Sequence, residues 1–150
     1  LYAFNGGAWG RVRSVDATTL SETTSAGTLL TAPLSTWSAT HTPATATQAT
    51  ASRALGAAGV RHVATSITAC LAAGATAQTP ILVNLRDGAT GAGTILWSSA
   101  ISAPVNDSNC TTLSGLGMIG TAATAMTVEF AAAGVAGSQE TVTLTGYSVQ

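Results

Sequence analysis

The sequence predicts an all-β protein: an antiparallel β-sandwich of the jelly-roll or immunoglobulin-like kind, with an extended N-terminal hairpin and arm. Apolar residues alternate with Thr and Ser in several short runs, turn residues separate these runs at roughly 8 to 15 residues, and no run has the period of an amphipathic helix. One sandwich core fits within 150 residues and leaves part of the chain over. We therefore divide the chain into a hairpin and attachment arm, residues 1–43, and a sandwich domain, residues 44–150.

The chain opens with the pattern of a β-hairpin. Tyr2 and Phe4 precede Asn5-Gly6, a dipeptide that readily takes the positive φ angles of a tight turn, and Trp9 begins a second alternating run. A two-stranded hairpin is only marginally stable by itself, so its aromatic rings need a covering surface. We expect another subunit to supply that surface.

Residues 14–43 are rich in Thr, Ser and Ala and have neither a helical nor a strand period. Their scattered apolar side chains have no pattern that would let them bury one another, so we expect the arm to dock onto a partner. The residues predicted to carry attachment or oligomerisation are Tyr2, Phe4, Trp9, Arg11, Arg13, Leu29, Leu30, Leu34 and Trp37.

Residues 44–150 contain the runs expected to form the sandwich. The run 44–53 is ambiguous, because Ala favours a helix whereas alternating Thr and Ser favour a strand, and we assign it to a strand. The other predicted strands are 60–71, 80–86, 94–101, 110–116, 126–132 and 140–149. Their apolar sides predict a core made of Val63, Ile67, Val83, Leu85, Trp97, Val128, Phe130 and Leu144.

Cys70 and Cys110 are the two cysteines of the chain, and their spacing matches no zinc or redox motif. Cys70 lies within a strand pattern, where a thiol packs as a small apolar side chain. We expect both cysteines to be reduced, with a disulfide between them as the alternative.

Only 7% of the residues are charged, against about 25% in a typical soluble domain. The surface must therefore consist mainly of hydroxyl and methyl groups. The 5 basic residues are all Arg, and they are scattered rather than gathered into the basic stripe that binds phosphates. No run approaches the roughly 18 apolar residues that span a bilayer. We expect neither nucleic acid nor a membrane as a partner.

Side chains suited to acid–base, nucleophilic or metal chemistry are few. Asp87 is expected in a solvated turn, Glu129 on the solvated side of a strand, and His62 on the side of its strand that faces away from Val63. His41 falls in the arm, and the spacing of the two His residues supplies no metal site. No G-x-S-x-G nucleophile motif occurs. We therefore expect no catalytic residue, no metal ligand, no cofactor and no enzymatic activity.

Two parts of the sequence resemble a known class of protein. The opening Tyr2-Ala3-Phe4-Asn5-Gly6-Gly7-Ala8-Trp9-Gly10-Arg11-Val12-Arg13 resembles the Tyr-x-Tyr/Phe-Asn-Gly-x-x-Trp-x-Arg-Val/Leu-Arg openings of tailed-bacteriophage structural proteins. The region from residue 44 onward, with its segments 61–63, 81–88 and 140–147, is similar to β-sandwich domains of phage virion proteins.

The resemblance implies a structural role in the virion and carries no catalytic residue over. We expect a capsid decoration, cement or head-fibre protein on the outer surface of a phage particle. Its expected partners are the major capsid protein or other virion subunits, and it is expected to form a homo-oligomer, with a trimer favoured. The alternatives are a tail or neck appendage that binds a receptor, and a cellular carbohydrate-binding or adhesion module. Trp97, Asp87 and Arg86 are the candidates for sugar recognition, although core packing is the better interpretation of Trp97.

Overall fold

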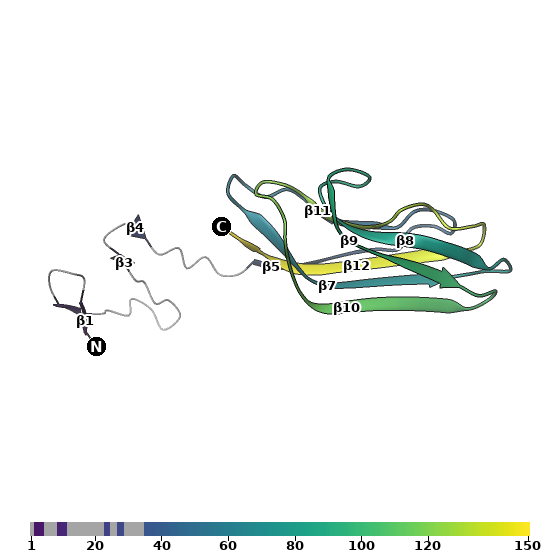
Figure 1. Cartoon of the computed structure of the whole chain (residues 1–150), viewed down its shortest axis with the longest axis horizontal. Helices are drawn as coiled ribbons and strands as arrows, with labels where there is room; N and C mark the ends of the chain where they lie inside the picture. The colour runs from purple at the N-terminus through teal and green to yellow at the C-terminus, as the bar shows by residue number, and fades with distance from the viewer. Residues whose placement is uncertain (1, 5–8, 12–22, 25–26, 29–34) are drawn as a thin grey trace. The chain divides into compact units, whose positions relative to one another are not determined.

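The structure is a computed structural model that describes residues 35–150 and, before them, residues 2–4, 9–11, 23–24 and 27–28. The chain divides into two units, Leu1–Pro33 and Leu34–Gln150. The described residues of unit Leu34–Gln150 form strands joined by turns and loops, and those of unit Leu1–Pro33 form short strands (Figure 1). The all-β prediction is confirmed.

Unit Leu34–Gln150 consists of two antiparallel sheets packed face to face (Figure 1). Strands β10 (Ser108–Ile119), β7 (Arg61–Ala72), β12 (Gln139–Val149) and β5 (Ser35–His41) pair in that order to form the first sheet. Strands β6 (Thr50–Arg53), β11 (Met126–Phe130), β8 (Gln78–Asp87) and β9 (Thr94–Ala103) pair in that order to form the second sheet. The predicted antiparallel β-sandwich is thereby confirmed.

The core lies between the two sheets, where alternate side chains of each strand meet. Of the residues predicted for the core, Trp97 alone is only half-buried, because it lies on the edge strand β9. A register shift between β8 and β9 turns the neighbouring Ile95 outward, and this side chain is 47% exposed. Val63 is buried but lies outside the core cluster. The other predicted core residues are all buried in the cluster: Ile67, Val83, Leu85, Val128, Phe130 and Leu144.

A β-bulge in β7 reverses the alternation that the sequence predicts for the start of this strand. The register against β12 passes from the pair Ser66/Thr145 directly to the pair Ala64/Gly146, which leaves one extra residue on β7. Ala64 therefore joins the core cluster, and His62, two residues earlier, is buried with 2% exposure. The prediction that His62 lies on the side facing away from the core was wrong for this reason.

Residues 35–41, which the sequence analysis assigned to the arm, belong to the sandwich. They form the edge strand β5, which pairs with β12 from His41 opposite Val142 to Ser35 opposite Ser148. The boundary between the two units lies at Pro33 and Leu34, so the predicted boundary at residue 43 is too late in the chain. The predicted strand 44–53 is shorter than expected, because only its last four residues form β6.

In unit Leu1–Pro33 the predicted N-terminal hairpin is confirmed. Strand β1 (Tyr2–Phe4) pairs antiparallel with β2 (Trp9–Arg11), and residues 5–8, where the sequence predicts the turn, lie outside the described residues. A second short pair joins β3 (Thr23–Thr24) to β4 (Gly27–Thr28).

Candidate interaction surfaces

The hairpin places its aromatic positions on one face. Tyr2 is opposite Arg11 and Phe4 is opposite Trp9 in the register. Residues two apart in a strand share a face, and directly opposed residues of an antiparallel pair do so too. All four positions therefore lie on the same face of the hairpin. Of the other predicted attachment residues, Arg13, Leu29, Leu30 and Leu34 lie outside the described residues.

Trp37, the remaining predicted attachment residue, packs against the sandwich rather than serving the arm. Its Nε1–H donates to Ser148 Oγ at 3.2 Å, and its ring meets the His62 ring edge-on at 5.8 Å between centroids. Gly146 makes room for this ring, since a Cβ there would lie 2.6 Å from Trp37 Cζ2. Strand β5 thus docks Trp37 against the core, where it is partly buried, and its assignment to a partner interface stays a prediction.

His62 is held from both sides of its ring. Nε2 lies 2.8 Å from the Ala54 carbonyl oxygen, and Nδ1 lies 2.9 Å from Ser148 Oγ. Because a carbonyl oxygen only accepts, the neutral ring carries its proton on Nε2 and accepts the Ser148 hydroxyl at Nδ1. The chain of bonds from Trp37 through Ser148 to His62 ties β5, β12 and β7 together at one end of the first sheet.

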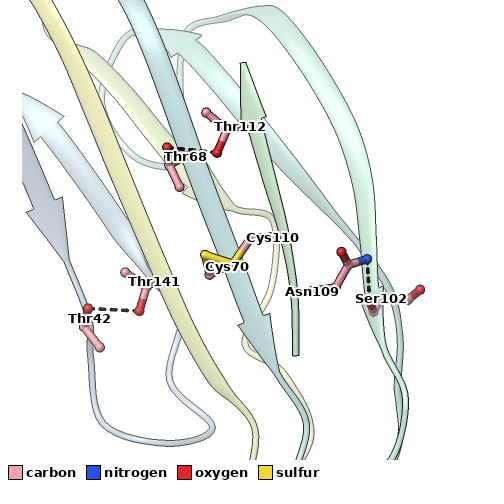
Figure 2. The surroundings of a disulfide bond; sticks show 8 residues. All are labelled: Thr42, Thr68, Cys70, Ser102, Asn109, Cys110, Thr112 and Thr141. Atoms are coloured by element: carbon pink, nitrogen blue, oxygen red, sulfur yellow. Dashed lines mark hydrogen bonds between the residues drawn. A yellow bond between two sulfur atoms is a disulfide. The ribbon is translucent and has the colours of Figure 1, made fainter. Parts of the chain in front are cut away.

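Cys70 of β7 and Cys110 of β10 form a disulfide on the outer side of the first sheet (Figure 2). They are directly opposed in the register, with their Cα atoms 4.1 Å apart. The expectation that both cysteines are reduced was wrong. Pairing of β7 with β10 brings the two residues together, and the spacing of cysteines along the chain does not reveal which strands pair.

The same outer side of the first sheet presents rows of hydroxyl groups, which we call the hydroxyl face. Thr40 bonds to Thr143 at 3.0 Å, and Thr68 bonds to Thr112 at 3.3 Å (Figure 2 for the latter pair). None of its positions carries a charged residue. From β5 through β12 and β7 to β10, its rows are Ser38, Thr145, Ser66 and Ser114; Thr40, Thr143, Thr68 and Thr112; and Thr42, Thr141, Cys70 and Cys110.

On the outer side of the second sheet, the carboxylate of Glu129 is buried, although the sequence analysis expected it to be solvated. Glu129 of β11 is 1% exposed, and its Oε1 pairs with Arg86 Nε of β8. The Gly91 N–H donates to Oε2 at 2.8 Å, so the 88–93 turn covers this part of the strand. The expectation for Glu129 was wrong because a turn from elsewhere in the chain lies over it.

Asp87, at the end of β8, is also engaged. Its Oδ2 accepts the Thr121 hydroxyl at 2.6 Å, and both its oxygens lie 2.9 Å from the Thr121 backbone nitrogen. Arg86 and Asp87, two of the three side chains suggested for sugar recognition, are therefore already bonded, to Glu129 and to Thr121. His41 also holds strands together: its Nδ1 accepts a hydrogen bond from the Thr50 N–H at 3.0 Å, which links β5 to β6.

Glu140 is a second buried acid, located at the start of β12 with 1% exposure. Its Oε2 accepts the Ala49 N–H at 2.8 Å. Burial raises the pKa of this carboxyl above its ordinary value, and the backbone N–H groups of Ala49 and Gly134 lower the pKa by less than burial raises it. In the sequence, Glu140 is two residues before Val142 and four before Leu144, so strand alternation puts all three on one side. That alternation was the signal from which the burial of Glu140 could have been predicted.

Within the described part of the chain, no three His, Cys, Asp or Glu side chains come together as a metal site. Among those same residues, no helix is long and apolar enough to cross a membrane.

No family model matches this chain, and no curated protein matches its sequence. A solved structure described as "CBM4 structure and function" is similar over 67% of this chain and 60% of that chain, with 14% identity and a TM-score of 0.32. Another, described as "Bacillus endospore appendages form a novel family of disulfide-linked pili", is similar over 78% of this chain and 91% of that chain, with 16% identity and a TM-score of 0.30. The chain thus spans 60% of the length of the first of these. The assignment of the fold rests on the sheets of this chain itself.

Proposed function

We propose that this chain is a non-enzymatic structural protein of a phage virion that decorates or stabilises the outside of the capsid, as a decoration, cement or head-fibre protein. The observation that carries the proposal is the hairpin of unit Leu1–Pro33, which places Tyr2, Phe4 and Trp9 on one face. A one-sided cluster of aromatic positions in a unit separate from the main core is the kind of feature that anchors one subunit to another.

The energetic argument favours attachment in many copies. At about 25 cal/mol per Å² and 150 to 250 Å² per ring, docking the three hairpin rings contributes on the order of 10 kcal/mol. Ordering each backbone residue of an attaching segment costs about 1 to 2 kcal/mol, so the net contribution of one hairpin is small. A shell that presents many identical sites makes such weak contacts sufficient.

The sandwich is suited to a mechanical role because its few polar and charged groups are used to hold strands and turns together. Arg86 with Glu129 fastens the 88–93 turn, and His62 with Ser148 joins strands of the first sheet. The proposed partners are the major capsid protein or other virion subunits, and the proposed state is a homo-oligomer.

The test uses virus particles stripped of the native protein. Full-length chain is expected to bind them, and a chain with Phe4→Ala and Trp9→Ala is expected to lose binding while keeping its melting temperature. Leu82→Ala is the matched control, because Leu82 is a 50% exposed apolar side chain of the sandwich, and it is expected to bind normally. An image of the re-bound particle should show density on the head. Unchanged binding by the double variant, or density on the tail alone, would contradict the proposal.

A further inference from the structure

We infer that the free edge of β10 is an interface at which a second copy of this chain pairs its own β10, antiparallel, across a two-fold axis. The contact concerns unit Leu34–Gln150 and does not depend on the attachment proposed for the N-terminal hairpin.

Strand β10 has a long free edge. It is 12 residues long and, among the described strands, pairs with β7 alone. Its ladder to β7 is regular from Ser108 to Ser114, and a bulge interrupts it before Met118. The 4.1 Å between the Cα atoms of Cys70 and Cys110 identifies a narrow pair, in which the two residues exchange no backbone hydrogen bonds. The backbone N–H and C=O groups of Cys110 and Thr112 therefore point away from β7, toward the free edge. A row of unpaired N–H and C=O groups can form hydrogen bonds to the backbone of another extended chain.

The other edge strands are less open. Strand β6 has only 4 residues, and β5, which has 7, is linked to β6 at its end by the bond from the Thr50 N–H to His41 Nδ1. Strand β9 has 10 residues, but its Ser102 carbonyl accepts the Asn109 side-chain amide at 3.2 Å (Figure 2). Natural edge strands are protected by charged residues, Pro or β-bulges, and the segment Ser108–Ser114 of β10 contains none of these.

The chemistry of β10 favours a second copy of itself as the occupant. Antiparallel pairing of one strand with its own copy is compatible with a two-fold axis, as an isologous interface requires. Strand β10 carries no charge, so two copies meet without like-charge repulsion. Its hydroxyl groups both donate and accept hydrogen bonds, which makes the strand complementary to itself. Leu116 and Met118 of β10 are half-buried against the core, and a neighbouring strand would cover them further.

The hydroxyl face would continue across such an interface, because Cys110, Thr112 and Ser114 form its last column. The pairing would give a single sheet with β5 at both ends and one continuous hydroxyl face.

The test compares the association of full-length variants by sedimentation equilibrium. Thr112→Pro removes an outward N–H while keeping the ladder bonds to β7, since Pro is tolerated where the N–H of an edge strand faces outward. Thr112→Lys keeps the backbone N–H and adds a like charge to both copies. Thr40→Lys is the matched control, because Thr40 lies in the same row, is likewise exposed, and belongs to the opposite edge strand β5.

We expect the wild-type chain to dimerise, and both Thr112 variants to weaken dimerisation at least tenfold with melting temperatures close to that of the wild type. Thr40→Lys should dimerise as the wild type does. Removal of residues 1–33 should leave the dimer intact, which separates this interface from the proposed hairpin attachment. A monomeric wild type, or a dimer or trimer that neither Thr112 variant weakens, would overturn the inference. If Thr112→Pro unfolds, Thr112→Lys alone decides the question.

Discussion

Strands β11 and β10 belong to the same sandwich but differ in how far their residues are buried. All 5 residues of β11 are buried, whereas none of the 12 residues of β10 is. Both strands contain large apolar residues. The difference comes from position, because β11 lies between β6 and β8 under the 88–93 turn, and β10 lies at an edge.

The consequence is a different source of stability for each strand. Strand β11 contributes by hydrophobic burial and by one buried ion pair. Strand β10 depends on its backbone bonds to β7, on contacts between hydroxyl groups and on the Cys70–Cys110 disulfide. Each change below tests one of these sources, and the expected effects decrease in order.

The largest effect is expected in β11. Phe130→Ala should lower the free energy of unfolding by about 3 to 5 kcal/mol, because it removes a fully buried ring and leaves a cavity. Leu113→Ala in β10 is the matched change at a half-buried position and should cost less than ~1.5 kcal/mol, because less apolar surface returns to water. Urea unfolding measures both. Equal costs would refute the contrast between the two strands.

Removal of the disulfide should act next most strongly, and it should act on β10. Cys70→Ala with Cys110→Ala is expected to lower the free energy of unfolding by about 2 to 4 kcal/mol. Hydrogen exchange should rise more at the amides of β10 than at those of β11, since β10 has no buried side chain to hold it. A uniform rise along both strands would argue that the disulfide has no local role.

A smaller effect is expected from breaking the ion pair over β11. Arg86→Met leaves the Glu129 carboxylate buried with the Gly91 N–H but without its cation, which should cost about 2 kcal/mol. Adding Glu129→Gln to this variant should recover part of the loss, because the neutral amide can still accept from Gly91. Thermal unfolding of the single and double variants measures this. If the second substitution recovers nothing, the charge of Glu129 is not the cause.

The smallest effect concerns pH. The pKa of Glu140 is raised in the folded state, so the folded chain binds a proton more tightly than the unfolded chain does. The contribution of Glu140 to stability is therefore fully present below its ordinary pKa and is lost as the pH rises through the raised value. Glu140→Gln should make the fall in melting temperature between acid and neutral pH shallower. A slope identical to that of the wild type would show that Glu140 does not contribute to it.

The sequence by itself determined the features that depend on neighbours a few residues away. Alternation of apolar and hydroxyl residues identified strands β7, β8 and β12 and most of the core, because the side-chain period of a strand is a local property. Asn5-Gly6 between aromatic runs identified the N-terminal hairpin. The same local pattern is present in β5, where Trp37 and Ala39 alternate with Ser and Thr. This strand was missed because residues 14–43 as a whole are rich in hydroxyl residues and show no regular period.

Only the tertiary structure decided which strands are neighbours and what covers their outer sides. The disulfide follows from the pairing of β7 with β10, and the burial of Glu129 follows from the 88–93 turn lying over β11. His62 is buried because a single extra residue in β7 moves it to the other side of the strand. These outcomes depend on contacts between residues distant in the chain and on one-residue shifts in register, and neither leaves a mark on the local period of the sequence.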